Sequence, residues 1–542
     1  MIELLLAAWM QSGAPPRAAA REVGSQVCAG CHRTIYQSYV TTGMARSSGR
    51  VGQDPLRESF AAAGFEDKPL GVRYRVSEAD GAYRLEFERA AAGVRGERRL
   101  RWFVGSGNVG RSYLFMQEGF LFQAPVSYFP AGGAWALSPG YAGKPVMDIA
   151  RPVELVCLNC HASRTQPVAG TENRYREPPF AEGGVSCERC HGPGSRHVEE
   201  RGAGRPMQAG EIVNPAKLPP ARRDSVCEQC HLTGASRVPR GALGVAGYRP
   251  GELLADSMSV YVWSGGEGGE RAATDHAEQL ARSGCRNGAG ERLACISCHD
   301  PHVQPGASVR VAYFRERCQS CHERQGCSET VERREARGND CAACHMPKAR
   351  SREGEHVAFT DHEIPRRPIA RTAGVTNAKR ELKPFWPGSG SERDLAVAYA
   401  GLGMEHAEFR AKALAMLEKL APKLPGDAEL LAQLAQYSDA MGQTKRAQEL
   451  YERVLRIDPG HVAAGANLGI YRARDGRVAE AMALWERIVA GHPGTTNAAV
   501  NLAVAQYGAG RKAEAEITLR RVLMFHPGHE PARRLLTAIS RQ

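Results

Sequence analysis

The chain of 542 residues has a formal net charge of +12, and 42% of its residues are hydrophobic while only 7% are aromatic. This length allows about two to four domains and a sizeable core, although the aromatic content is light for one. Beyond the N-terminus no stretch approaches the roughly 18 apolar residues of a membrane-spanning helix, so no transmembrane segment is expected.

The N-terminus has part of the pattern of an export signal. Ile2 to Met10 is a short apolar run, and the three alanines at 18–20 resemble a cleavage site. Glu3 stands where such a signal usually carries a positive charge. We therefore interpret residues 1–20 as a weak export signal, or as the remainder of one whose true start lies upstream.

Seven Cys-x-x-Cys-His motifs follow in residues 21–370 and use all but two of the 16 cysteines. Two cysteines three residues apart sit on one turn and form thioethers to the two vinyl groups of a haem, while the adjacent histidine reaches the iron. The motifs predict seven covalently attached haems c. The thioether cysteines are Cys28, Cys31, Cys157, Cys160, Cys187, Cys190, Cys227, Cys230, Cys295, Cys298, Cys318, Cys321, Cys341 and Cys344. The proximal iron ligands are His32, His161, His191, His231, His299, His322 and His345.

Other chemistries of paired cysteines fit less well. A zinc ribbon needs two pairs per metal and no histidine directly after the second cysteine, whereas here the number of pairs is odd and each has its histidine. A thioredoxin-like site uses one pair beside a βαβ pattern, which is absent here. Haems at about −1 to −2 each also offset much of the basic excess, so nucleic acid is not expected as a partner. Haem attachment of this kind takes place outside the bacterial cytoplasm, which predicts a periplasmic or otherwise exported protein.

A stretch without cysteine interrupts the motifs at residues 71–141. Runs of alternating polarity at 74–76, 83–87 and 100–104 are typical of strands, and Asp80-Gly81 between the first two is a hairpin turn signal. We predict a small β-rich insertion within a mainly α domain that is organised by its haems.

Each iron needs a sixth ligand or remains open. Ten histidines lie outside the motifs. Five lie in the C-terminal repeats and are excluded as ligands: His406, His461, His492, His526 and His529. The candidate distal ligands are Met44, His197, His276, His302, His356 and His362. Met44 follows the first motif by the length of a short helix, and methionine is the other common axial ligand of haem c. Six candidates for seven irons leave one haem that is five-coordinate, the state that a catalytic haem requires.

Two cysteines lie outside the motifs. Cys285 and Cys327 flank the fifth and sixth motifs. In an oxidising compartment, unpaired cysteines of this kind predict a disulfide.

After a linker at 371–390, the sequence acquires a repeat in residues 391–542. The prolines that mark its period of 34 residues are Pro425, Pro459, Pro493 and Pro527. A unit of this length, with small residues where helices touch and proline at its end, matches the tetratricopeptide repeat. Three units are clear, and residues 391–426 form a degenerate fourth. We predict an α-solenoid of helix pairs that offers a concave surface to a protein or peptide partner.

Several strings resemble multihaem cytochromes of the cytochrome c-554-like family, above all those that are fused to tetratricopeptide repeats. The strings are GGVSCERCHGPG through His197, CISCHDPH at 295–302, CAACHMP at 341–347, VGSG at 104–107, RSYL at 111–114 and SPGY at 138–141. The resemblance implies closely packed haem pairs with mostly bis-histidine ligation. It also implies histidine at the position of Met44, so this chain departs from its relatives there.

The motifs favour an exported electron-transfer cytochrome whose repeats dock a redox partner or an assembly scaffold. The alternative is a multihaem reductase that acts on a small nitrogen or sulfur compound at a five-coordinate haem, because the wider superfamily contains such enzymes. No catalytic residue can be assigned from the sequence. A scaffold with purely structural haems is a third interpretation, and seven redox centres speak against it.

Overall fold

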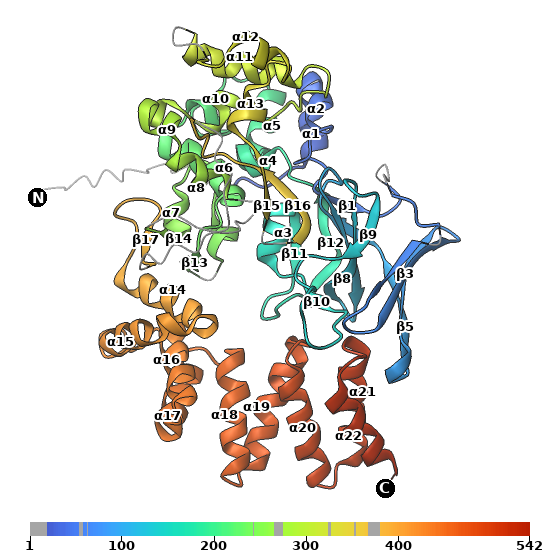
Figure 1. Ribbon diagram of the computed structural model, residues 1–542. Coiled ribbons are helices and arrows are strands. Elements are labelled where there is room, and N and C mark those ends of the chain that lie inside the picture. Colours follow the sequence, from blue (N-terminus) through green and yellow to red (C-terminus); the bar gives the residue numbers. More distant parts are fainter. Residues whose placement is uncertain are drawn as a thin grey trace, which may run out of the picture.

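The computed structural model describes residues 19–53, 58–61, 63–241, 243–264, 275–323, 327–351, 354–366 and 380–541, and the side chains of 349–358 are not described. The interpreted export signal lies outside the described residues except for its last two positions. The described residues form a β-rich N-terminal part and a helical C-terminal part (Figure 1). The N-terminal part therefore contains more strand than the expected mainly α fold.

Two antiparallel sheets make up the β-rich part. The larger has the order β1–β6–β7–β8–β10 with β9 also paired to β8, and the smaller has the order β2–β3–β4–β5. The strands are β1 (Ser48–Arg50), β2 (Ala63–Asp67), β3 (Val72–Ala79), β4 (Ala82–Arg89), β5 (Val94–Leu100), β6 (Trp102–Val104), β7 (Arg111–Gln117), β8 (Phe120–Phe129), β9 (Ala134–Leu137) and β10 (Arg151–Pro152). The sheets thus extend on both sides of the predicted insertion at 71–141.

The predicted hairpin and its alternating strands are confirmed. Asp80 and Gly81 have φ of 54° and 68°, and they connect β3 to β4 where Ala79 pairs with Ala82. Two residues in the left-handed region form the turn whose twist suits a hairpin. Along β3, Val72 and Tyr74 are buried while Arg73 is exposed, so the alternation of the sequence places one face of the strand in the core.

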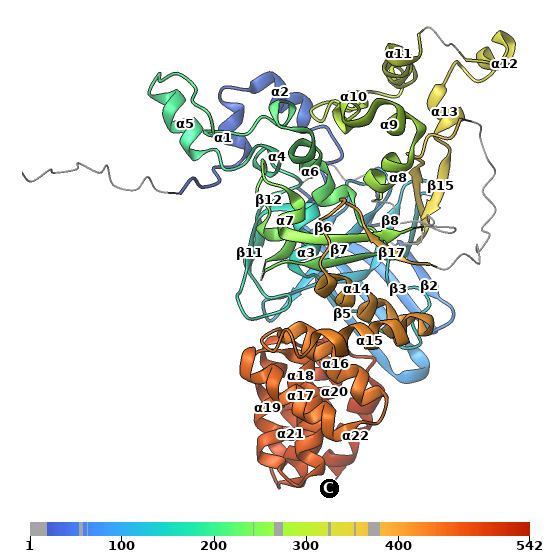
Figure 2. The same ribbon diagram turned by 90° about the vertical axis from the view of Figure 1, so that its left-hand side faces the viewer.

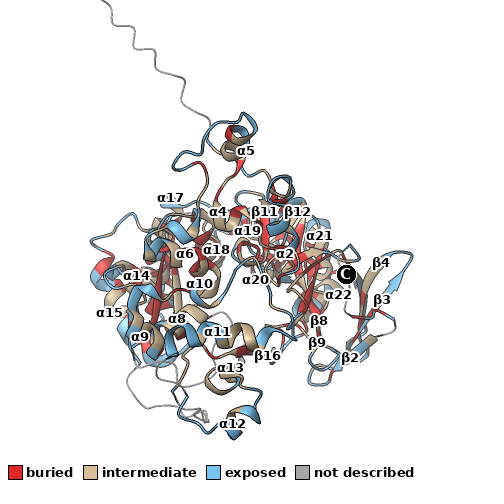
Figure 3. Cartoon of the chain, turned by 90° about the horizontal axis from the view of Figure 1, so that it is seen from above, coloured by how far each residue is buried: buried red, intermediate tan, exposed pale blue. Residues whose placement is uncertain are grey.

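The seven motifs lie on short helices, most of them at the top of Figure 1. These helices and their neighbours are α1 (Ser25–Ala29), α2 (Arg33–Tyr39), α3 (Leu155–His161), α4 (Glu188–His191), α5 (Ser195–Gly202), α6 (Pro220–His231), α7 (Leu254–Ser257), α8 (His276–Arg282), α9 (Gly284–Ala289), α10 (Cys295–Cys298), α11 (Arg310–His322), α12 (Val331–Glu335) and α13 (Cys341–His345). Figure 3 shows α11, α12 and α13 almost entirely as exposed or intermediate. Within the described residues from 275 to 348, Ala294 is the only buried hydrophobic side chain. Protein side chains alone therefore provide almost no core here.

Three smaller sheets accompany these helices. They contain β11 (Ala162–Pro167) with β12 (Tyr175–Gly183), β13 (Ser236–Pro239) with β14 (Met258–Trp263) and β17 (Leu382–Pro384), and β15 (Lys348–Ser351) with β16 (Gly354–Thr360). β17 lies within the region interpreted as a linker. Its pairing with β14 ties the start of the C-terminal part to the motif-bearing part.

The C-terminal part is a row of antiparallel helix pairs. Its helices are α14 (Glu392–Glu405), α15 (Arg410–Leu420), α16 (Ala428–Ala440), α17 (Thr444–Ile457), α18 (Val462–Arg474), α19 (Val478–Gly491), α20 (Thr496–Gly508), α21 (Lys512–Phe525) and α22 (Glu530–Arg541). The repeated alanines 447, 481 and 515 are all fully buried, because a small residue there lets two helices approach closely. The repeated glycines 442, 476 and 510 have φ between 74° and 78° and form the turns within the units. No helix within the described residues has the length and apolar character needed to cross a membrane.

The turns between the helix pairs dock against the β-rich part, as Figures 1 and 2 show. Phe525 at the end of α21 joins the core of the sheets, with its ring 5.6 Å from that of Phe122. Gly528 packs so closely on Met147 that a Cβ atom would lie 2.8 Å from the Met147 carbonyl oxygen. Arg521 adds an ion pair of 3.1 Å with Glu118. The edge of the solenoid that these turns form is therefore fixed against the sheets.

One carboxylate in this contact makes it sensitive to acid. Burial by itself raises the pKa of Asp148, but hydrogen bonds from His526, the Ala150 N–H and Lys144 outweigh it and hold the pKa well below its usual range. The folded protein thus binds this proton more weakly than the unfolded chain does, so the stabilisation is complete above about pH 4 and is lost as the pH falls further. We expect the thermal unfolding midpoint of the wild-type protein to drop more steeply below pH 4 than that of Asp148→Asn. At pH 7 the variant should lose on the order of 1 kcal/mol. Parallel pH profiles would contradict this role of Asp148.

Candidate functional site

Each motif uses one helical turn to bring its three functional side chains together. α3, α4, α6, α11 and α13 all end at the motif histidine, and His299 directly follows α10. The backbone N–H of His32 donates to the carbonyl of Cys28 at 2.9 Å, and that of His191 to Cys187 at 3.0 Å. Residues three and four apart on such a turn share one face. This is the arrangement that attachment of haem to both cysteines and to the histidine requires.

Cysteines of motifs that are far apart in the sequence lie against one another. The backbone N–H of Cys187 donates to Ser25 Oγ, beside the first motif, at 3.0 Å. The Cys28 and Cys187 thiols lie next to one another there, and their interaction raises the pKa of Cys28 and lowers that of Cys187. The same contact joins the second motif to the fourth, the fourth to the fifth, and the sixth to the seventh. The pairs are Cys160 with Cys230, Cys227 with Cys295, and Cys318 with Cys341.

Two further contacts connect these pairs. Arg189 of the third motif donates to the Gln229 side chain of the fourth at 3.0 Å, and Gln229 donates back to the Arg189 carbonyl at 3.2 Å. The ring of His299 in the fifth motif lies 5.5 Å from that of Phe314 on α11, the helix that carries the sixth motif. The motifs therefore form one connected series in the order 1, 3, 4, 5, 6, 7. The second motif lies beside the fourth and also beside the third, where Arg189 donates to the Asn159 carbonyl at 2.8 Å.

Three candidate distal histidines face a motif histidine ring to ring. The centroid distances and interplanar angles are 6.3 Å and 18° for His32 with His197, 6.0 Å and 13° for His191 with His302, and 6.2 Å and 30° for His299 with His362. Two imidazoles that bind opposite sides of one metal, each with a bond of about 2 Å, have centroids roughly 6 Å apart. The three pairs have this spacing, so their donors fit a haem iron between them.

The fourth motif also meets a candidate histidine, but less regularly. The rings of His231 and His276 are 5.2 Å apart and tilted by 58°, with their Nδ1 atoms at 3.2 Å. Burial, followed by nearby histidines, lowers the pKa of His276 to about 2 and that of His231 to about 4. Both rings are therefore neutral at physiological pH, which is the form that binds a metal.

His161, His322 and His345 have no ring contact with another histidine in the described part of the chain. His356 lies on β16, and its side chain is outside the described residues. The first motif's histidine, His32, faces His197, and Met44 as a distal ligand stays a prediction. Ser47 in this turn donates to the His161 carbonyl at 2.9 Å, so Met44 lies in the neighbourhood of the second motif.

The surroundings of the motifs fit a large, partly polar cofactor. Large apolar side chains next to or inside the motifs are exposed: Val27 (46%), Val156 (45%) and Ile296 (38%). Such side chains are usually buried, but the protein has few other apolar side chains here to cover them. Buried polar atoms nearby lack a partner among the described residues: His161 Nδ1, His197 Nδ1, Asn159 Nδ2, Ser186 Oγ and the Tyr248 hydroxyl. Porphyrin faces would cover the apolar side chains, and propionates or waters would satisfy the polar atoms.

Tyr248 is a residue that the sequence analysis missed. Its side chain is 1% exposed, and burial followed by the charges of Cys190 and Cys227 raises its pKa. It therefore lies between the third and fourth motifs. A lone tyrosine in a loop gives no periodic or spacing signal, so only the fold could reveal it.

Cys285 and Cys327 are both free thiols in the structure. Cys285 is half-buried on α9, and Cys327 is exposed. Burial followed by Cys321 raises the pKa of Cys285, so this thiol lies near the sixth motif. The disulfide between the two cysteines stays a prediction.

Three family models match separate segments of the chain. The model "Cytochrome c554 and c-prime" matches residues 144–192, the model "Doubled CXXCH motif" matches residues 288–326, and the model "Tetratricopeptide repeat" matches residues 472–539. These matches confirm the resemblance that the motif strings and the 34-residue period indicated.

Curated relatives include a multihaem cytochrome and a sulfite reductase. The chain is 24% identical over 238 residues to the multiheme cytochrome MtrA of Shewanella baltica, covering 42% of this chain and 54% of MtrA. It is 27% identical over 202 residues to the dissimilatory sulfite reductase MccA of Wolinella succinogenes, covering 33% of this chain and 24% of MccA. The chain thus spans about half the length of the first and a quarter of the second. Among solved structures, MamA of Desulfovibrio magneticus is 19% identical with a TM-score of 0.25, covering 28% of this chain and 85% of MamA.

Proposed function

We propose that this multihaem c-type cytochrome with C-terminal tetratricopeptide repeats is an exported electron carrier with seven covalently attached haems. The observation that carries the proposal is the unbroken series of contacts between motifs. Haem bound at each motif supplies a one-electron redox centre. Because neighbouring motifs lie against one another, centres attached there are close enough for electrons to pass between them.

The proposed route runs through motifs 1, 3, 4, 5, 6 and 7, with motif 2 as a side branch at motif 4. Both ends of this route are accessible. Cys31 and His32 of the first motif are exposed, and the exposed helix α12 lies just before the seventh. Electrons would thus enter at one end of the motif-bearing part and leave at the other. The paired histidines set the potentials along the route as axial ligands.

The tetratricopeptide repeats would dock a protein partner. Their inter-repeat turns already contact the β-rich part, which leaves the helical faces of the solenoid for other molecules (Figure 2). Solenoids of this kind bind peptides or proteins along such surfaces. The partner would therefore be held at a fixed position relative to the haems.

The number of haems and the route can be tested on the purified exported protein. We expect its intact mass to show seven haems, and Cys341→Ala with Cys344→Ala to show six. The control, Cys285→Ala with Cys327→Ala, should keep seven because these cysteines lie outside the motifs. Anomalous scattering of iron in crystals should place the second iron next to the fourth. A lower wild-type count, or a second iron nearest to any other, would contradict the proposal.

A reductase is the second candidate function. It is favoured by His161, which is half-buried on the second motif and has no ring contact with another histidine in the described part of the chain. An iron held there without a sixth protein ligand would bind a small compound such as sulfite, nitrite or hydroxylamine.

The two functions differ in what happens to the small compound. We expect the reduced protein to pass its electrons to an external ferric acceptor and to consume none of the three compounds. The spectrum of the oxidised protein should also stay unchanged when they are added. Sustained consumption of one of these compounds, together with a high-spin haem signal that shifts when the compound binds, would contradict the electron-carrier function and support the reductase.

A further inference from the structure

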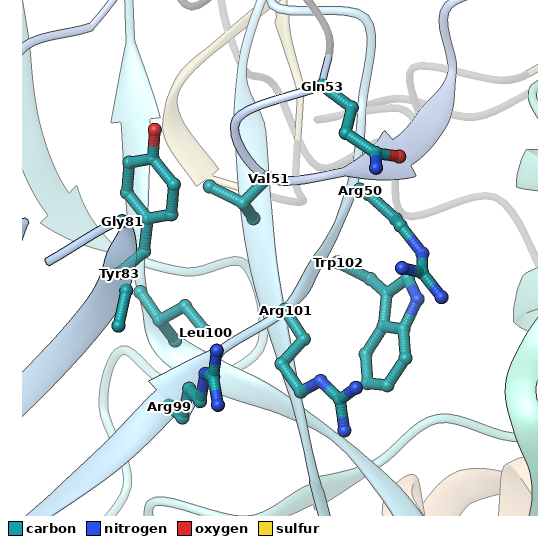
Figure 4. Close-up of a pocket in the computed structure, with 10 residues that line it drawn as sticks. Arg50, Val51, Gln53, Gly81, Tyr83, Arg99, Leu100, Arg101 and Trp102 are labelled. Atoms are coloured by element: carbon teal, nitrogen blue, oxygen red, sulfur yellow. The ribbon is translucent and has the colours of Figure 1, made fainter.

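The corner where β5 turns into β6 forms a small basic pocket far from the cysteines of the motifs in sequence. It has a volume of about 140 Å³ and is lined by Arg50, Gln53, Tyr83, Arg99, Arg101 and Trp102, among others. Figure 4 shows these side chains around the pocket, with the guanidinium groups of Arg50 and Arg101 on either side of the indole of Trp102. None of the described residues that line it is a carboxylate.

The charges of this pocket are only partly balanced within the chain. Arg101 forms an ion pair with Glu177 and lies over the ring of Trp102. Arg50 and Arg99 have no ion pair within the described residues. Arg99 also stands directly opposite Arg84 in the β4–β5 register, and like charges in this position are destabilising. Two positive charges at the pocket therefore lack a negative partner.

The pocket also contains a buried donor without an acceptor. Trp102 is 1% exposed, and its indole Nε1 has no hydrogen-bond partner in the described part of the chain. A buried donor without an acceptor destabilises the fold, because the water it loses on burial is not replaced. Arg50 pairs with Trp102 across β1 and β6, so the two side chains stand on the same face of the sheet. Figure 4 shows the indole nitrogen turned toward the Arg50 guanidinium.

We propose that this pocket binds a small doubly charged oxyanion of the sulfate, sulfite or phosphate class. Two oxygens of the anion accept from the guanidinium fork of Arg50, which suits such groups. The indole N–H of Trp102 donates to a third oxygen of the anion, and Arg99 supplies the second positive charge. The net charge of the pocket thus matches a dianion, and its volume holds one such ion with a few waters. The proposal is independent of the proposed electron-carrier function, because it needs no electron transfer.

Calorimetric titration of sodium sulfate into the oxidised, haem-loaded protein tests the pocket, with ionic strength held constant by sodium chloride. We expect one site per chain that phosphate competes for and chloride does not. Arg50→Gln should weaken sulfate binding about tenfold or more, and Trp102→Phe, which keeps the packing but removes the N–H, about fivefold. The control Arg73→Gln changes the net charge equally from an exposed position outside the pocket, and should leave the affinity within about twofold.

Three outcomes would overturn the site. The first is the absence of sulfate binding to the wild-type protein. The second is an equal loss in Arg50→Gln and Arg73→Gln, which would mean a general charge effect. The third is that a haem propionate, not a free anion, supplies the oxygens in the pocket. A propionate could reach it because Trp102 packs in one cluster with Leu158, which lies inside the second motif. If wild-type protein binds no sulfate while Arg50→Gln shifts a haem potential, the propionate occupies the pocket.

Discussion

Replacement of His302 by methionine should raise the midpoint potential of one haem, the one attached at Cys187 and Cys190. The rings of His191 and His302 are the most nearly parallel of the histidine pairs, at 13° and 6.0 Å. A thioether in place of an imidazole stabilises ferrous iron and raises the potential. The expected shift is on the order of 0.1 V, a modest part of the roughly 0.8 V that axial ligands span. A potentiometric titration followed by absorbance measures it.

His302→Ala and His406→Met complete the experiment. The alanine variant removes the sixth ligand, so one haem in seven should become high-spin in the oxidised protein. The methionine variant at position 406 lies on the repeats, which hold no motif, and should leave every potential unchanged. The fold should survive at position 302, because the His302 side chain is 37% exposed. Unchanged potentials in both His302 variants would remove this residue from the ligands.

Local features of the motif-bearing part were predictable from the sequence, and its spatial order was not. The cysteine and histidine of one motif are joined by a single helical turn, so their spacing in the sequence determines their geometry. The contact of Cys28 with Cys187 joins residues far apart in the chain, and no local pattern encodes it. The facing rings of His32 and His197 show the same limit, because these residues are also far apart in the chain.

The two flanking parts differ in a similar way. The repeats were predictable because each unit contacts mainly its neighbours, so a period of 34 residues translates directly into stacked helices. The β-rich part was recognised only between 71 and 141. Its outer strands are short and depend on pairing with distant partners, as β1 does with β6. β17, inside the predicted linker, likewise becomes a strand only through its pairing with β14.

Arg111→Met should destabilise the β-rich part by about 3–5 kcal/mol. Arg111 and Glu58 form an ion pair of 3.5 Å whose side chains are 1% and 0% exposed, and the Arg111 guanidinium also lies 4.0 Å from the ring centroid of Phe103. Tyr113 hydrogen-bonds the same carboxylate. Methionine fills much of the volume of arginine but removes the Arg111 cation from beside the buried Glu58 carboxylate. The loss of this buried ion pair, rather than lost packing, dominates the expected cost.

Chemical denaturation followed by near-ultraviolet circular dichroism measures this loss. Glu58→Gln combined with Arg111→Met should recover part of it, because neither charge then remains buried. The control Arg75→Gln breaks an exposed ion pair with Glu86, whose side chains are 61% and 46% exposed, and should cost less than about 1 kcal/mol. If the double variant is no more stable than Arg111→Met, the cost comes from packing around Phe103 instead.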